Sequence, residues 1–112
     1  MRVYIAGPIT GVENYREHFD TAEALLVAKG CEVINPAHLC DVLPGDVRYE
    51  EILNICLHTL LPMADYVALL PGWEKSLGAN REYGWAVAMD LIVMDVEDYL
   101  IGGKADGCRG II

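Results

Sequence analysis

One segment of this 112-residue chain, Asp65–Leu70, is almost wholly apolar, and it constrains the fold more than any other feature. A strand that is apolar on both faces must be covered on both faces, and such strands are typical of parallel sheets. Pro71 and Gly72 follow it directly and favour a turn. The pattern therefore predicts a strand of a parallel sheet that is buried on both faces, from which the chain continues into a loop and a helix.

Three other short runs have strand composition, and segments with helical periodicity separate them. The strands are expected at Arg2–Ala6, Cys31–Asn35 and Leu91–Met94, and the helices at residues 14–29, at 49–61 and after the loop 72–78. This alternation predicts an α/β fold whose parallel sheet of four or five strands is covered by helices on both sides. Residues 37–48 are expected to form a loop, and the tail after Asp95 gives no clear pattern.

The limits of the first helix are marked by particular residues. Asn14 and Glu17 have the spacing of a capping box, in which each residue satisfies a backbone N–H group of the other. Gly30 follows Lys29 and is expected to end the helix, because glycine readily adopts the left-handed conformation that often follows a last turn.

Composition indicates one domain, residues 1–112, with an apolar core. Apolar residues make up 54% of the chain, and the formal net charge is −9. Proteins that bind DNA or RNA neutralise phosphates with clustered Lys and Arg, so this charge argues against a nucleic acid polymer as partner. Apolar runs are much shorter than the roughly 20 residues that span a bilayer. The first residues favour a strand over a signal peptide, so we expect a cytoplasmic protein without a membrane partner.

The cysteines and histidines lack the spacing of a metal site. They are Cys31, Cys40, Cys56, Cys108, His18, His38 and His58, and they include no Cys-x-x-Cys pair. We expect reduced thiols and neither a metal nor a cofactor. Cys31 and Cys56 lie in apolar runs and are expected in the core.

Glu82 is the charged residue that bears most on function. At helical spacing it shares a face with Ala79, Ala86 and Met89, so its carboxylate is expected to point inward. A buried carboxylate is costly without a partner. Glu82 is therefore either a structural residue that pairs with an arginine or caps a loop, or a catalytic acid, base or nucleophile.

Two glycine-rich loops are expected at the same edge of the sheet as Glu82. They are residues 7–11, after the first strand, and residues 72–78, after the third. Ligands of open α/β sheets bind beyond the carboxyl ends of the strands. Ser76 and Gly78 open a helix, whose N-terminal N–H groups can hold a phosphate or a carboxylate. The alternative is that Ser76 only caps the helix and Gly78 only eases its first turn.

Two motifs on these segments resemble the nucleoside 2-deoxyribosyltransferase superfamily, which includes the deoxynucleoside-monophosphate N-glycosidases. They are Tyr4-Ile5-Ala6-Gly7-Pro8-Ile9-Thr10-Gly11 and Ser76-Leu77-Gly78-x-x-x-Glu82-x-Gly84-x-Ala86. The run Leu70-Pro71-Gly72-Trp73 also resembles a compact, often phage-encoded branch of that superfamily. The similarity extends to about Asp95. It implies a flavodoxin-like (Rossmann-like) three-layer sandwich that cleaves or transfers at the N-glycosidic bond of a nucleoside or nucleoside 5′-monophosphate.

The resemblance also implies roles for particular residues. Glu82 matches the nucleophile that attacks the anomeric carbon and forms a covalent glycosyl-enzyme intermediate. The matching substrate-binding residues are Tyr4, Gly7, Pro8, Ile9, Thr10 and Gly11 on the first motif, Ser76 and Gly78 at a 5′-phosphate, and Gly72 and Trp73 before them. Trp73 is either a platform for the base or a lid over the core. A homodimer or larger homo-oligomer is implied as well.

The chain departs from the superfamily at one position. An aspartate usually lies eight residues ahead of the third strand's first aspartate, and Leu57 occupies this position when it is counted from Asp65. Cys56 and His58 flank Leu57, and a shift of the helix register at Pro62 would bring one of them to this position. His58 is either a substitute acid or a surface histidine. Carboxylates of the preceding loop or of a partner subunit are further candidates. If none of these groups supplies a proton, the alternative function is a non-catalytic protein that senses or sequesters a nucleotide.

Overall fold

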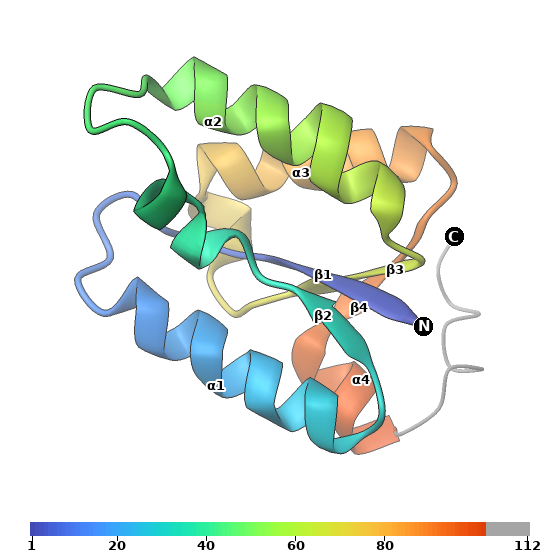
Figure 1. The fold of residues 1–112 in the computed structure, drawn as a ribbon. Helices are drawn as coiled ribbons and strands as arrows, with labels where there is room; N and C mark the ends of the chain where they lie inside the picture. Colours follow the sequence, from blue (N-terminus) through green and yellow to red (C-terminus); the bar gives the residue numbers. More distant parts are fainter. Residues whose placement is uncertain (103–112) are drawn as a thin grey trace.

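The computed structural model describes residues 1–102, and these residues form an α/β sandwich around one parallel sheet (Figure 1). Its strands are β1 (Arg2–Ala6), β2 (Glu32–Ile34), β3 (Tyr66–Leu69) and β4 (Ile92–Asp95), in the order β2-β1-β3-β4. Tyr4 at the centre of β1 is level with Ile34 of β2 and Val67 of β3. The predicted α/β fold of flavodoxin-like type is confirmed, with four strands in the sheet.

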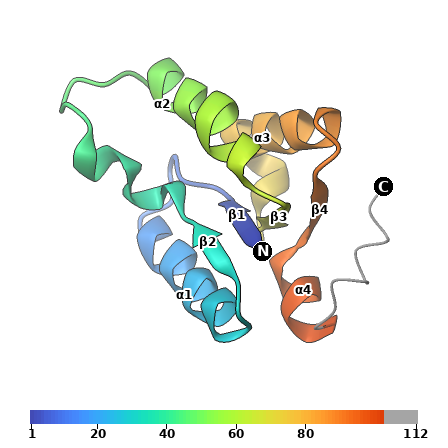
Figure 2. The same cartoon turned by 45° about the vertical axis from the view of Figure 1, so that its right-hand side comes forward.

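Helices cover both faces of the sheet (Figures 1 and 2). Helices α1 (Tyr15–Ala28) and α4 (Val96–Gly102) lie on one face, and α2 (Tyr49–Ile55) and α3 (Leu77–Ala88) lie on the other. Successive residues of β1 point to opposite faces, so Val3 and Ile5 pack with the α1 side while Tyr4 and Ala6 pack with the α3 side. Within residues 1–102, no helix has the length and apolar character needed to cross a membrane.

The helix expected at residues 49–61 is divided into three parts. Helix α2 ends at Ile55, Cys56–Leu60 forms a π-helical turn, and Leu61–Met63 forms a 3₁₀ turn. The backbone N–H of Leu61 donates to the carbonyl of Cys56, five residues earlier. Pro62 has no N–H to donate and its ring obstructs a regular helical turn before it, which accounts for the break. Short π turns are rare and occur frequently at functional sites.

The segment expected as a loop at residues 37–48 begins with a 3₁₀ helix, η1 (Pro36–Val42). Two side chains of η1 fix it to α1. Arg16 of α1 donates to both carboxylate oxygens of Asp41, at 3.0 and 2.8 Å, and His38 bonds Asp20 at 2.7 Å. The tail after Asp95 forms α4 as far as Gly102. Cys108 lies outside the described residues.

Both predicted limits of the first helix are correct to within a residue, but the capping box expected at its start is absent. Gly30 adopts a φ of 92° directly after the end of α1, as expected. Asn14 makes no side-chain hydrogen bond at the start of α1, because its backbone φ and ψ of −107° and 37° lie outside the extended region that a capping residue usually adopts. A capping contact occurs instead at α2, where the N–H of Arg48 donates to Glu51 at 2.9 Å.

Candidate active site

A cavity of about 270 Å³ lies between the carboxyl end of β1 and the first turns of α3. The loop after β1 and helices α1, η1, α2 and α3 all contribute to its wall. The lining residues are Gly7, Ile9, Thr10, Tyr15, Phe19, Pro36, Ala37, Cys40, Tyr49, Ile52, Leu53, Cys56, Ser76, Gly78, Ala79 and Glu82. The cavity lies at the β1–β3 pair, where the strand order changes direction, and ligands of sheets with this order bind at that point.

Glu82 enters the cavity wall from α3 and is only 8% exposed, so its predicted inward orientation is confirmed. The hydroxyl of Tyr4 donates a hydrogen bond to a carboxylate oxygen of Glu82. Tyr4 is completely buried and does not itself line the cavity. Tyr4 therefore holds the carboxylate from the side of the sheet, and the cavity is on the other side of Glu82.

Burial raises the pKa of Glu82 to about 7, although hydrogen bonds from Tyr4 and Cys56 act in the opposite direction. Burial also raises the pKa of Tyr4 well above its ordinary value, and the nearby Glu82 raises it further. The phenol consequently stays protonated and remains a hydrogen-bond donor at neutral pH. Glu82 is divided between its neutral and ionised forms near pH 7, so a nucleophilic or basic carboxylate is available under ordinary conditions.

Cys56 is the third polar group at this end of the cavity. Its side chain is buried beside Tyr4 and Glu82, and both neighbours affect the pKa of its thiol. Burial raises the pKa of this thiol to about 11, so Cys56 is uncharged at neutral pH. A neutral thiol is a weak donor, whereas the nucleophilic form of cysteine is the thiolate.

The sequence placed Cys56 beside the Leu57 position without pairing it with Glu82, and its apolar surroundings predicted a core residue. Burial confirms that prediction, and the contact with Glu82 adds to it. A signal was available in the spacing of Ile52 and Cys56. These residues are four apart on one helical face, and both line the cavity.

The first turn of α3 forms the side of the cavity opposite α1. Ser76 accepts a hydrogen bond from the N–H of Ala79 at 3.1 Å, so it does cap the helix. A Cβ atom on Gly78 would lie 3.1 Å from the hydroxyl oxygen of Tyr49. The glycine therefore allows Tyr49 at the start of α2 to approach α3 closely.

A second cavity, of about 650 Å³, adjoins the first one at this turn. Both walls contain Thr10, Tyr49, Ser76 and Gly78, and the second wall extends to Lys75. The second cavity thus combines an ammonium group with the N-terminus of a twelve-residue helix. Both features favour an anionic group.

The glycines and the proline of the two loops differ in which cavity they line. A Cβ atom on Gly7 would lie 2.8 Å from the Cβ of Leu70, so only glycine fits at this point of the first cavity wall. Pro8 and Gly72 line the second cavity, and Gly72 adopts a φ of 89°. Gly11 turns the chain with a φ of 81° and lies outside both walls.

Two further predicted site residues, Trp73 and His58, also lie outside both cavity walls. Trp73 packs against Tyr83, with ring centroids 5.0 Å apart, and against the core on the α3 side, as the lid interpretation expects. His58 is exposed and contacts the edge of Trp85 at a centroid distance of 4.9 Å. It is Cys56, two residues earlier, that the structure brings to Glu82. The acidic residues Asp41 of η1, Asp46 of the following loop, and Glu50 and Glu51 of α2 do not line the first cavity either.

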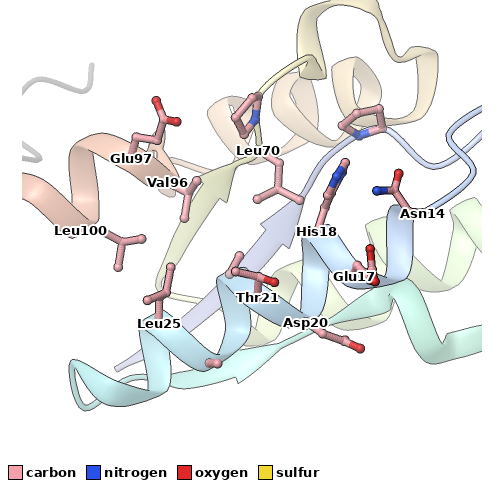
Figure 3. A pocket seen from close by; sticks show the side chains of 14 residues that line it. Asn14, Glu17, His18, Asp20, Thr21, Leu25, Leu70, Val96, Glu97 and Leu100 are labelled. Atoms are coloured by element: carbon pink, nitrogen blue, oxygen red, sulfur yellow. The ribbon is translucent and has the colours of Figure 1, made fainter.

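A third hollow, of about 1060 Å³, lies on the opposite face of the sheet, between α1 and α4. Leu25, Val96 and Leu100 line it, and Figure 3 shows His18 and Glu17 farther along α1 on the same wall. This hollow shares only Pro8 with the second cavity and no residue with the first. It is therefore separate from the surroundings of Glu82.

Comparison with curated proteins and with solved structures gives no match for the chain. A protein-family model does match, over residues 1–95. The matched range contains all four strands of the sheet, both glycine loops and Glu82. The chain belongs to the family described as Domain of unknown function (DUF4406).

Proposed function

We propose that this protein cleaves the N-glycosidic bond of a nucleoside or nucleoside 5′-monophosphate, or transfers its sugar, with Glu82 as the nucleophile. The observation that carries the proposal is the buried carboxylate of Glu82, held by Tyr4 in the wall of a cavity at the carboxyl ends of the strands. The resemblance of the motifs around Gly7 and Ser76 to the nucleoside 2-deoxyribosyltransferase superfamily supports the same role.

In the proposed reaction, the ionised carboxylate of Glu82 attacks the anomeric carbon while the bond to the base breaks. The sugar passes through an oxocarbenium-like transition state, and a covalent glycosyl-enzyme ester forms. A carboxylate in a largely apolar wall stabilises that positive charge more strongly than it would in water. Water or a second base then attacks the same carbon and releases Glu82.

The second cavity supports a phosphate on the 5′ position of the substrate. Its wall contains Lys75 and the first turn of α3, and it shares Ser76 and Gly78 with the cavity of Glu82. A sugar placed against Glu82 would extend its 5′ group toward this turn. We therefore expect nucleoside monophosphates to be better substrates than nucleosides, and we expect Lys75→Ala to reduce that preference.

The direct test incubates the protein with deoxynucleosides and their monophosphates. Chromatography measures the released base. Glu82→Gln should reduce the rate by at least about 10³-fold, because it removes the nucleophile and keeps the shape of the side chain. Glu74→Gln is the matched control, because Glu74 is an exposed glutamate outside the first cavity. Undiminished turnover in Glu82→Gln would refute the proposal.

The second candidate function is a protein that binds a nucleotide without cleaving it. The observation that favours it is the thiol of Cys56 beside Glu82, where a carboxyl group would be a better proton donor. This alternative predicts that a nucleotide raises the melting temperature through mass action while no base is released. Release of base that depends on Glu82 would exclude it.

A further inference from the structure

Three aromatic rings share the wall of the first cavity with Glu82. They belong to Tyr15 and Phe19 of α1 and to Tyr49 of α2. Phe19 is 1% exposed and contacts the edge of Tyr15, with ring centroids 6.4 Å apart. Aromatic faces attract cations, and a carboxylate beside them strengthens that preference. This part of the wall therefore has the composition of a site for a cationic ring.

Two of these rings already have a cation close to them. The guanidinium of Arg16 lies 5.7 Å from the ring centroid of Tyr15, and that of Arg81 lies 5.9 Å from the ring centroid of Tyr49. Arg16 is neutralised by its paired hydrogen bonds with Asp41. Both rings thus already take part in cation–π contacts within the folded protein.

The polar side chains of the same wall determine whether the departing base can receive a proton. Among the described residues that line the cavity, the polar side chains other than Glu82 are hydroxyls and thiols, and burial raises the pKa of the Cys56 thiol to about 11. A neutral base departs as an anion unless an acid protonates it, and a general acid typically accelerates such a step by about 10² to 10⁴. A base that already carries a positive charge departs as a neutral molecule and needs no proton.

We infer that the substrate of this cavity is an N-glycoside whose base carries a positive charge, either a pyridinium or a ring-alkylated purine. The inference rests on the proposed function and narrows its substrate class. The aromatic rings receive the charged base, Glu82 faces the sugar, and the turn at Ser76 and Lys75 receives the 5′-phosphate.

The chemical step balances without an acid. A Glu82 oxygen forms a bond to the anomeric carbon, and the electron pair of the breaking carbon–nitrogen bond moves onto the ring nitrogen and cancels its charge. Water then attacks the anomeric carbon, the Glu82 carboxylate leaves, and the surplus proton of the water passes to solvent. The products are a neutral base, a free sugar phosphate and a proton.

The test uses two matched pairs of substrates that differ in the charge of the base. One pair is nicotinamide mononucleotide and its reduced, uncharged form. The other is 7-methyl-2′-deoxyguanosine 5′-monophosphate and 2′-deoxyguanosine 5′-monophosphate. Base release is measured by chromatography for the wild type, Glu82→Gln and Glu74→Gln, with spontaneous release subtracted.

We expect the charged member of at least one pair to react about 10²-fold faster than its neutral partner, or more, and that pair identifies the kind of base. Equal or faster release from the neutral members would overturn the inference and leave the proposed function intact. Absence of Glu82-dependent release from all four compounds would also overturn the inference, and the wider set of deoxynucleosides and monophosphates would then test the proposed function separately.

The role of the aromatic wall is tested separately at Tyr49. With the charged substrate, Tyr49→Leu should raise KM about tenfold more than Tyr49→Phe, because only the phenylalanine retains a ring that attracts a cation. Circular dichroism and the melting temperature establish that both variants fold. Equal KM values for the two variants would show that the Tyr49 ring does not contribute to binding of the cation.

Discussion

At the scale of single residues, the proton of Glu82 couples stability to pH. The folded-state pKa of about 7 lies above the ordinary value of 4.5, because burial penalises the charged form. The folded protein therefore binds this proton more tightly than the unfolded chain does. The resulting stabilisation is complete below about pH 4.5 and is lost as the pH rises through about 7.

Glu82→Gln removes this dependence on pH. The variant should be more stable than the wild type above pH 7, by up to about 3 kcal/mol, and the difference should shrink as the pH falls toward 4.5. Urea denaturation of both proteins at pH 5 and pH 8 measures the free energies of unfolding. A stability difference that is the same at both pH values would contradict the assigned burial of Glu82.

Tyr4 should set the pH at which activity appears. If the ionised carboxylate is the nucleophile, kcat/KM of the wild type rises with pH through about 7. The hydroxyl of Tyr4 lowers the pKa of Glu82, so Tyr4→Phe should move this rise to higher pH. The measurement is a pH–rate profile of both proteins, and a profile that is unshifted in the variant would argue against the role of Tyr4.

The residues of the site differ in how far the sequence reveals them. Glu82 was predictable, because its spacing from Ala79 and Ala86 shows the inward face of a helix without any knowledge of the rest of the fold. Its partner Tyr4 lies 78 residues away, and this contact exists only through tertiary structure. The spacing of Cys56 from Ile52 places it on the cavity side of α2, whereas apolar periodicity does not reveal the π turn that begins at Cys56.

At the scale of elements, two glycines provide a matched pair of substitutions. An alanine Cβ at Gly7 would lie 2.8 Å from the Cβ of Leu70, so Gly7→Ala should destabilise the protein by about 1–3 kcal/mol. Gly84 lies within α3 and has open space around it, so Gly84→Ala should stabilise the protein by up to about 1 kcal/mol. Thermal unfolding of both variants measures the two effects. Melting temperatures that shift in the same direction would contradict the close approach of Gly7 and Leu70.

The order and type of the main elements followed from the sequence, whereas irregular helical turns did not. The apolar residues of β3 and the glycine after α1 give local signals that tertiary contacts do not alter. Helix η1 lies in a segment with few periodic apolar residues, and the polar contacts of Arg16 and His38 with neighbouring carboxylates fix it to α1. Such contacts join separate parts of the chain and leave no periodic pattern.

At the scale of the whole molecule, the charge of −9 should determine which phosphate-containing ligands bind. A duplex would approach over a large surface and be repelled, whereas the mononucleotide that we propose as substrate would enter one cavity beside Lys75. We expect no change in the fluorescence anisotropy of a labelled DNA duplex at about 0.15 M salt. Binding that weakens steeply with added salt would indicate a basic surface that the described residues do not show.

The bond between Tyr4 and Glu82 also has a consequence for folding. It joins β1 to α3 across 78 positions of the chain, so the candidate nucleophile acquires its partner only after these distant elements have met. Contacts of such long range form slowly, because a large loop must close first. Recovery of activity during refolding should therefore lag behind the recovery of helical signal, and a fragment that lacks β1 should be inert even where its helices form.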